Sequence, residues 1–188
     1  MAPSMTEGTA AATSQQATSP RGNPSPMVDM WKRLGYKSEV ATAVGIILLN
    51  NENKVFVARR IDNAKKFWQM PQGGVDEGED FLQAAYRELE EETSVKSVEL
   101  IKELDGTITY ELPDRLLGII WKGKYKGQKQ KWFLMKFTGD EKEIDIKTKN
   151  PEFLDWKWID LDQLTEVVVD FKLHVYKELQ EKVKKIIN

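Results

Sequence analysis

The stretch GGVDEGEDFLQAAYRELEEETSV, residues 73–95, decides what kind of fold this chain adopts. It joins a glycine-rich acidic segment to a run of helix formers in which four of the five positions from Glu88 to Glu92 are glutamate. Because a helical residue advances roughly 100 degrees, Glu88, Glu91 and Glu92 share one flank. Like charges at this spacing destabilise a helix by roughly a few tenths of a kcal/mol per pair. A positive partner is therefore expected, either Arg87 with nearby lysines on a solvated face, or a divalent cation held by carboxylate oxygens.

Composition limits both the class of protein and the chemistry. The 188 residues allow one domain with its own core, and 28 basic against 30 acidic side chains leave a net charge of -2, so no global field favours a polyanionic partner. The chain has no cysteine and a single histidine, His174, which argues against disulfides, thiolate metal sites and multi-histidine zinc sites. Catalysis is expected to rest on carboxylates, lysine, arginine or tyrosine. No apolar stretch approaches the roughly 18 to 20 residues that cross a bilayer, and we expect a cytoplasmic protein without membrane contact.

The first thirty residues differ in composition from the rest. They are rich in Ala, Ser, Thr, Gln and Pro and poor in large apolar side chains. Such a segment cannot bury enough surface to offset the entropy lost on ordering. We expect a disordered N-terminal tail at residues 1–30 and a folded domain over residues 31–188. The tail also lacks the apolar segment of a secretory signal.

Short β-rich runs and two helical patterns indicate the fold class. The final helix is expected over residues 170–187, where an apolar stripe repeats every four residues. Asp80 stands near the start of the other predicted helix. Strands with a helix between them and another at the end predict an α+β domain with helices packed against a mixed sheet. The expected strands are residues 40–50, 54–60, 98–104, 107–111, 131–138 and 156–159.

The spacing within residues 73–95 is specific. Five residues separate Gly73 from Glu79, and seven more precede the sequence Arg-Glu-Leu-Glu-Glu-Glu-Thr-Ser-Val that starts at Arg87. This pattern resembles the Nudix box, which has a glycine, a glutamate and an Arg-Glu-apolar-any-Glu-Glu-any-Gly-apolar ending at those intervals. Ser94 departs from it, because the family has there the glycine that closes the helix without left-handed backbone strain. The resemblance implies an α/β/α sandwich around a mixed β-sheet, and hydrolysis of a phosphoanhydride bond linked to a nucleoside.

Further motifs narrow the resemblance within the family. The segments ARR, WQMPQGG, GQKQKWFL, NPEFLDWKW and FKLHVYKEL are similar to the branch that contains RNA pyrophosphohydrolases and dinucleoside polyphosphate hydrolases. The resemblance implies a Mg²⁺-dependent pyrophosphohydrolase, with Mn²⁺ as a substitute, that acts on RNA 5′-triphosphate ends or on dinucleoside polyphosphates. We expect a monomer. Two alternatives are a hydrolase that clears free nucleoside triphosphates and a non-catalytic nucleotide- or RNA-binding module. Ala41 stands where relatives often carry an arginine that contacts 5′ phosphates, so the choice of substrate stays open.

The resemblance also implies roles for individual residues. The metal ligands that it implies are Glu88, Glu91, Glu92, Glu152 and Gly73. The catalytic residues are Glu88, Glu91, Glu152 and Arg87, with Glu91 or Glu152 as the base that takes a proton from water. The substrate-binding positions are Arg60, Gln72, Tyr110, Gln128, Lys131, Phe171 and Lys172. Taken without the resemblance, Phe171 also fits a core position and Tyr110 a strand end.

A basic and aromatic segment, WKGKYKGQKQKW at residues 121–132, has two interpretations. Lysines and aromatic rings together can bind a single strand by phosphate attraction and base stacking. The same lysines could equally solubilise an ordinary hairpin, in which case they face water while Trp132 is buried. His174 is interpreted as a surface residue. The segment contains Lys122, Lys124, Lys126, Lys129 and Lys131 together with Trp121, Tyr125 and Trp132.

Overall fold

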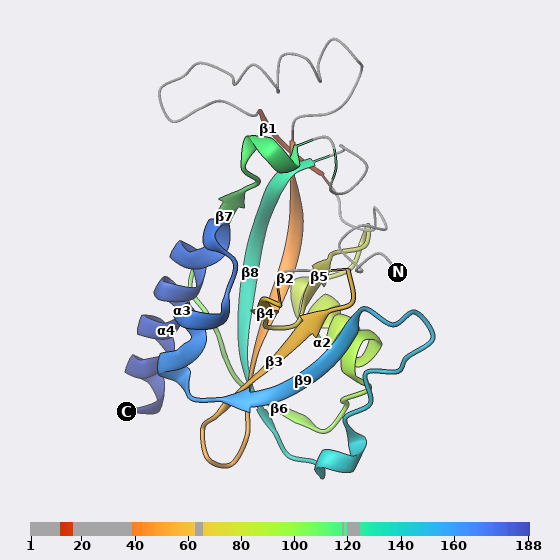
Figure 1. Ribbon diagram of the computed structural model, residues 1–188, viewed down its shortest axis with the longest axis vertical. Helices are drawn as coiled ribbons and strands as arrows, with labels where there is room; N and C mark the ends of the chain where they lie inside the picture. The colour runs from red at the N-terminus through yellow and green to blue at the C-terminus, as the bar shows by residue number, and fades with distance from the viewer. Residues whose placement is uncertain (1–11, 17–38, 63–65, 118, 120–124) are drawn as a thin grey trace.

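The computed structural model describes residues 12–16, 39–62, 66–117, 119 and 125–188 (Figure 1). In these residues a mixed sheet is formed by β1 (Ala12–Gln16), β2 (Glu39–Leu49), β3 (Val55–Arg60), β4 (Trp68–Gln69), β5 (Gln72–Gly74), β6 (Val98–Glu103), β7 (Ile108–Glu111), β8 (Tyr125–Phe137) and β9 (Phe153–Ile159). The α-helices are α2 (Phe81–Thr93), α3 (Leu164–Val167) and α4 (Leu173–Ile187). Short 3-10 turns lie at Asp114–Leu116, Glu141–Glu143, Leu161–Gln163 and Asp170–Lys172. No helix among these residues is long and apolar enough to span a bilayer.

Strands β2 and β8 form the centre of the sheet. They run parallel along their whole length, with Gly45 opposite Trp132, whereas all the other strand pairs are antiparallel. Strand β2 is almost continuously apolar, which suits a strand covered on both faces. The strand order through the centre is β4-β3-β2-β8-β6.

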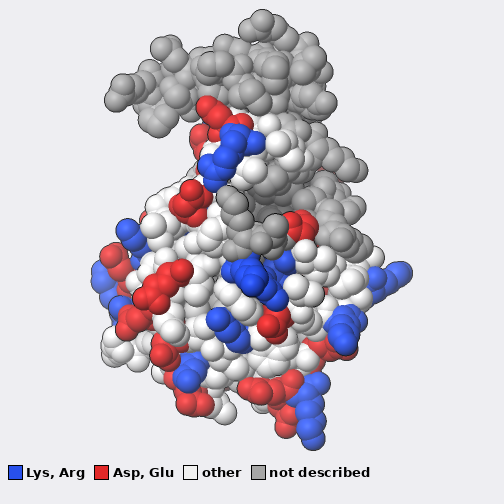
Figure 2. All heavy atoms as spheres, in the orientation of Figure 1, with Lys and Arg blue, Asp and Glu red and all other residues white. Residues whose placement is uncertain are grey.

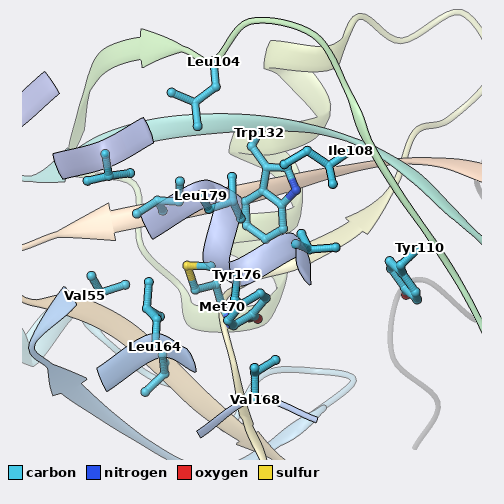
Figure 3. Packing of buried hydrophobic residues seen from close by; sticks show 14 of the residues in the cluster. Val55, Met70, Leu104, Ile108, Tyr110, Trp132, Leu164, Val168, Tyr176 and Leu179 are labelled. Carbon is cyan, nitrogen blue, oxygen red and sulfur yellow. Dashed lines mark hydrogen bonds between the residues drawn. The ribbon is translucent and has the colours of Figure 1, made fainter. Parts of the chain in front are cut away.

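A helical layer covers each face of the sheet, so the predicted sandwich is confirmed (Figure 1). On one face, α4 contributes Val175, Leu179 and Val183 to a core that also contains Trp132 and Tyr176 (Figure 3). On the other face, the apolar side of α2 packs against β2, β3 and β8 in a second core. Helix α2 is the element that carries the acidic run, so its polar flank lies at the edge of this second core.

Both ends of α2 are explained by single side chains. The Asp80 side chain accepts a hydrogen bond from the Gln83 N–H at 2.8 Å, which caps the first turn. Ser94 closes the helix with φ 65° and ψ 7°, the left-handed conformation that the sequence predicts for this position. Its N–H donates to the Glu90 carbonyl at 2.8 Å, and its hydroxyl donates to the Asp145 carbonyl at 2.8 Å.

Several predicted boundaries differ from the structure. Gly73 and Gly74 were expected in a loop before the helix, but they belong to β5, which pairs with β2. Strand β8 begins at Tyr125 rather than at residue 131, because polar side chains that alternate along its first half are buried among other polar groups. Strands as short as β4 and β5, and the single turn α3, leave no periodicity for a sequence to reveal.

The N-terminal tail also differs from expectation in one segment. Strand β1 pairs antiparallel with β2, with Ala12 opposite Ala41 and Gln16 opposite Glu39. Backbone hydrogen bonds to a strand edge need no apolar side chains, so composition alone does not exclude such a strand. The rest of residues 1–30 lies outside the described residues, and the boundary between tail and domain stays a prediction.

Candidate active site

Arg87 holds the acidic helix and the strand before it together. Its Nε and Nη2 donate to the two oxygens of Glu79 at 2.8 and 2.9 Å, and Nη2 also donates to the Gly74 carbonyl at 2.9 Å. Its Nη1 donates to Glu88 at 2.9 Å and lies 3.2 Å from Glu91. Hydrogen bonds from Arg87 lower the pKa of Glu79, and the same contact with Glu79 raises the pKa of Arg87. Part of the negative charge on α2 is therefore offset by the arginine within the box.

Three carboxylates are buried together despite this arginine. Glu88, Glu92 and Glu152 are 0%, 2% and 8% exposed. One oxygen of Glu92 accepts the Gln72 N–H at 3.1 Å, while the other, Oε2, is buried without a hydrogen-bond partner among the described residues. Burial raises the pKa of Glu92 well above its ordinary value, and the charges of Glu152 and Glu88 raise it further. Such a group is costly to ionise unless a cation is close.

The chemistry of these groups fits a hard divalent cation. Buried carboxylate oxygens are the donors that Mg²⁺ prefers. In the described parts of the chain, no three acidic or histidine side chains gather tightly enough to form a complete metal cage. A Mg²⁺ ion commonly uses only one or two carboxylates and completes its shell with water and substrate phosphate, so a partial set of protein ligands is sufficient.

Glu91 is placed differently from the other glutamates of the box. Its side chain is 52% exposed and pairs with Arg87 one turn earlier on the helix. The predicted trio on one flank is therefore split, with Glu88 and Glu92 buried and Glu91 turned toward solvent. The helical angle places the three side chains near one another but does not say which of them the sheet covers.

Gly73 lies against the carboxylate of Glu88. A Cβ atom built at this position would be 2.0 Å from Glu88 Cδ, so no side chain fits there. The close approach results from the pairing of β5 with β2, which presses the strand against α2. This packing explains the glycine, whereas the implied role of Gly73 as a metal ligand stays a prediction.

Two cationic side chains reach the same buried region from other elements. Arg60, at the end of β3, donates from Nε to Asp62 at 2.8 Å, but its Nη1 is buried without a partner in the described structure. Lys172 is 4% exposed, and its Nζ lies 5.2 Å from the centre of the Tyr110 ring. Burial and the nearby charge of Arg60 lower the pKa of Lys172 to about 7, while Glu92 opposes this shift. Arg60 likewise opposes the raised pKa of Glu92, so the two cations face the buried carboxylates.

A network of buried polar side chains lines this region on the sheet. Gln130 Nε2 donates to Gln72 Oε1 at 2.8 Å and to Gln128 Oε1 at 2.9 Å. The Tyr110 hydroxyl donates to Gln128 Oε1 at 3.2 Å, and Trp132 Nε1 donates to Gln130 Oε1 at 3.2 Å. Burial raises the pKa of Tyr110, so its hydroxyl stays protonated. These side chains come from β5, β7 and β8 and face the same side of the sheet.

Most of the predicted substrate positions come together here, and one does not. The rings of Tyr110 and Phe171 are tilted against each other at 5.9 Å, which brings Phe171 to the same cluster. Lys131 instead points away, because residues alternate along β8, and its Nζ donates to the Gly106 carbonyl at 3.2 Å. Two residues of the network, Gln130 and Trp132, were not among the predicted site positions. The alternation in GQKQKW carries that signal, since its glutamines and Trp132 share one face.

The basic and aromatic segment is only partly described, since residues 121–124 lie outside the described residues. Lys126 does not face water as an ordinary hairpin would require. It is buried and pairs with Glu111 at 2.7 Å, because β7 and β8 are neighbours. Basic and acidic side chains are interspersed over the face that Figure 2 shows, without a continuous basic track. His174 is exposed as expected, and its Nε2 lies 3.0 Å from the Thr109 carbonyl oxygen.

Comparison with known proteins agrees with this arrangement. Residues 40–179 match the NUDIX domain. The chain is 74% identical over 145 residues to an RNA pyrophosphohydrolase of Pelagibacter ubique (strain HTCC1062), a match that covers 77% of this chain and 92% of that protein. It is 47% identical over 139 residues to an RNA pyrophosphohydrolase of Sphingopyxis alaskensis, covering 73% of this chain and 88% of that protein.

A solved structure supports the fold independently. The dihydroneopterin triphosphate pyrophosphohydrolase of E. coli superposes with a TM-score of 0.56 at 20% identity, covering 75% of this chain and 95% of that one. At this identity the likeness concerns the fold alone.

Proposed function

The chain belongs to the Nudix family, and from this premise we propose that it removes pyrophosphate from the 5′-triphosphate end of RNA. The observation that carries the proposal is the 74% identity to an RNA pyrophosphohydrolase over 92% of that protein's length. The buried site supports it, because carboxylates and cations face one another there as binding of a metal and a phosphate chain requires.

Members of the family typically depend on a divalent metal ion, and we propose Mg²⁺ for this chain, with Mn²⁺ as a substitute. Glu88 and Glu92 would hold the ion, because both are buried and one oxygen of Glu92 is left for a ligand. When bound, the ion supplies Lewis-acid stabilisation of phosphate oxygens and a more acidic water. Arg87 fixes the Glu88 carboxylate through its contact at 2.9 Å, so its contribution is to orient a ligand.

Glu152 is the favoured base. It is buried in the same region as Glu92, whose pKa its charge raises. Glu91 is bound by Arg87 and turned toward solvent, which places it less well to take a proton from a water near the buried site. Proton removal by a carboxylate within reach of the attacking water contributes about a hundredfold or more to rate.

Arg60 and Lys172 would bind the phosphate chain. The buried Nη1 of Arg60 is a donor aimed into a region that the described residues leave without an acceptor for it. Lys172 adds a second positive charge near Tyr110 when it is protonated. Fixed cations in a water-poor site stabilise the negative charge that develops on the phosphate oxygens. These residues could replace the contact that Ala41 does not make.

Product analysis with Mg²⁺ tests the proposed function. The purified protein is incubated with a 5′-triphosphorylated RNA oligonucleotide, with diadenosine tetraphosphate or with free GTP at matched concentrations. We expect pyrophosphate and 5′-monophosphorylated RNA to form fastest, and the Glu92→Gln variant to form neither. Faster cleavage of the dinucleotide or of free GTP would contradict the proposal and assign the site to a small-molecule hydrolase.

A further inference from the structure

The hydrogen-bond network between Trp132 and the buried glutamines has a direction that chemistry fixes. An indole N–H can only donate. Trp132 Nε1 lies 3.2 Å from Gln130 Oε1, so the amide oxygen of Gln130 must face the indole. The amide nitrogen of Gln130 then faces the other way, toward Gln72 Oε1 at 2.8 Å and Gln128 Oε1 at 2.9 Å. One donor-only group thus determines how three amides are turned.

The indole that sets this direction is itself held firmly. Its ring lies edge-on to Tyr176 with centroids 6.3 Å apart. Gly45 lies directly opposite on β2, and a Cβ atom there would come within 2.5 Å of the indole ring. The glycine therefore leaves just enough room for the ring, and the ring cannot turn without displacing the core around it.

The two outer glutamines are consequently turned the same way. Gln130 binds the carbonyl oxygens of both Gln72 and Gln128, so their amide nitrogens point away from Gln130. The Tyr110 hydroxyl also donates to Gln128 Oε1 at 3.2 Å, which reinforces this orientation. All three glutamines are buried, so a wrongly turned amide would place two like groups against each other without water to separate them.

This orientation matters because the network adjoins the proposed site. The Gln72 N–H donates to Glu92 at 3.1 Å, and Lys172 lies 5.2 Å above the Tyr110 ring. A phosphate chain offers only acceptors, so side chains that line its site should present N–H groups and not carbonyl oxygens. Amides turned with their oxygens away from the substrate meet this requirement.

We propose that Gln130, held by the Trp132 indole, is a positioning residue that turns the amides of Gln72 and Gln128 so that they donate to the anionic substrate. Gln130 itself does not touch the substrate, because both ends of its amide are already bound within the protein. The inference rests on the proposed function and adds the residues that set the polarity of its binding surface.

The experiment measures KM and kcat for a 5′-triphosphorylated RNA oligonucleotide with Mg²⁺ in the full chain. The variants are Gln130→Met, which keeps the size but removes the hydrogen bonds, Trp132→Phe, which removes the indole donor, and the combination of both. Gln180→Met is the matched control, because Gln180 on α4 donates to the Leu161 carbonyl at 2.8 Å outside the network. Melting temperatures are recorded for every protein.

Each single variant is expected to raise KM about tenfold, the scale of one lost hydrogen bond, while kcat changes less than about threefold. The double variant should be no worse than the weaker single one, because both changes interrupt the same chain of contacts. Unchanged KM in Gln130→Met, or multiplied KM losses in the double variant, would overturn the inference. If Trp132→Phe does not fold, Gln130→Met against Gln180→Met decides the matter alone. Failure of the wild type to act on RNA would instead remove the proposed function.

Discussion

The Glu88 carboxylate occupies the space that a side chain at Gly73 would need, since a Cβ atom there would lie 2.0 Å from Glu88 Cδ. The first glycine and the first glutamate of the box are therefore in contact, although fifteen positions separate them in the sequence. The spacing of the motif reflects this contact between β5 and α2.

Gly73→Ala should consequently abolish most of the activity. The added methyl group must displace Glu88, which is fully buried and bound by Arg87 at 2.9 Å, so the carboxylate loses its position. Overpacking of this kind costs about 1–3 kcal/mol of stability. We expect turnover to fall by more than about a hundredfold in protein that is still folded, as circular dichroism would show. Near-normal turnover would mean that Glu88 need not be held in place.

Glu92→Gln should remove turnover and yet stabilise the metal-free protein. The folded pKa of Glu92 is raised above its unfolded value by burial and by Glu152 and Glu88, so ionisation favours the unfolded state. Its contribution to stability therefore falls as pH rises above the unfolded value of about 4.3 toward the folded pKa. Glu92→Gln should lack this loss, which urea unfolding of both proteins at pH 5 and pH 8 can measure as a difference.

Mg²⁺ should reverse the comparison between these two proteins. An ion that binds only the folded state stabilises it by about 2.7 kcal/mol at a hundred times its Kd. We expect the melting temperature of the wild type to rise with Mg²⁺ and that of Glu92→Gln to stay nearly constant. An equal rise in both proteins would place the ion elsewhere.

Glu152 and Glu91 should differ in their contribution to rate. Glu152 is buried beside Glu92, whereas Glu91 is half exposed and bound to Arg87. We expect Glu152→Gln to lower kcat at least about a hundredfold, as loss of a general base does, and Glu91→Gln to lower it less. Single-turnover measurements with saturating Mg²⁺ separate this effect from weaker metal binding. The opposite order would identify Glu91 as the base.

The sequence predicts the large elements of this fold well, because β2, β3, β6, β7, α2 and α4 each carry a period or an apolar run of their own. It identifies the glutamates and the left-handed end of α2 through the motif. It cannot tell which glutamates are buried, since that depends on how closely β5 approaches the helix. The roles of Gln130 and Trp132 were missed for a similar reason. Their partner Gln72 is 58 positions away from Gln130, and only the pairing of β2 with both β5 and β8 brings them together.

Lys172 should make substrate binding sensitive to pH near neutrality. Burial and Arg60 lower its pKa to about 7, so in the free enzyme it is charged below that pH and neutral above it. We expect KM for triphosphorylated RNA to rise between pH 6 and pH 8 in the wild type. Lys172→Arg keeps the charge throughout this range and should flatten the profile, while Lys172→Met should give a high KM at every pH. Parallel profiles in all three proteins would assign the dependence to another group.

Ser94 separates backbone strain from side-chain bonding at the end of α2. Its φ of 65° disfavours any side chain, but its hydroxyl compensates by donating to the Asp145 carbonyl at 2.8 Å. Ser94→Ala loses the hydrogen bond and keeps the strain, so it should destabilise the protein by about 1 kcal/mol. Ser94→Gly loses the same bond but relieves a strain of about 1 kcal/mol, so its stability should stay close to that of the wild type. Urea unfolding measures both differences. Turnover should be unchanged in both variants because the hydroxyl faces Asp145 and not the buried carboxylates, and equal destabilisation by Ala and Gly would show that the left-handed backbone carries no strain here.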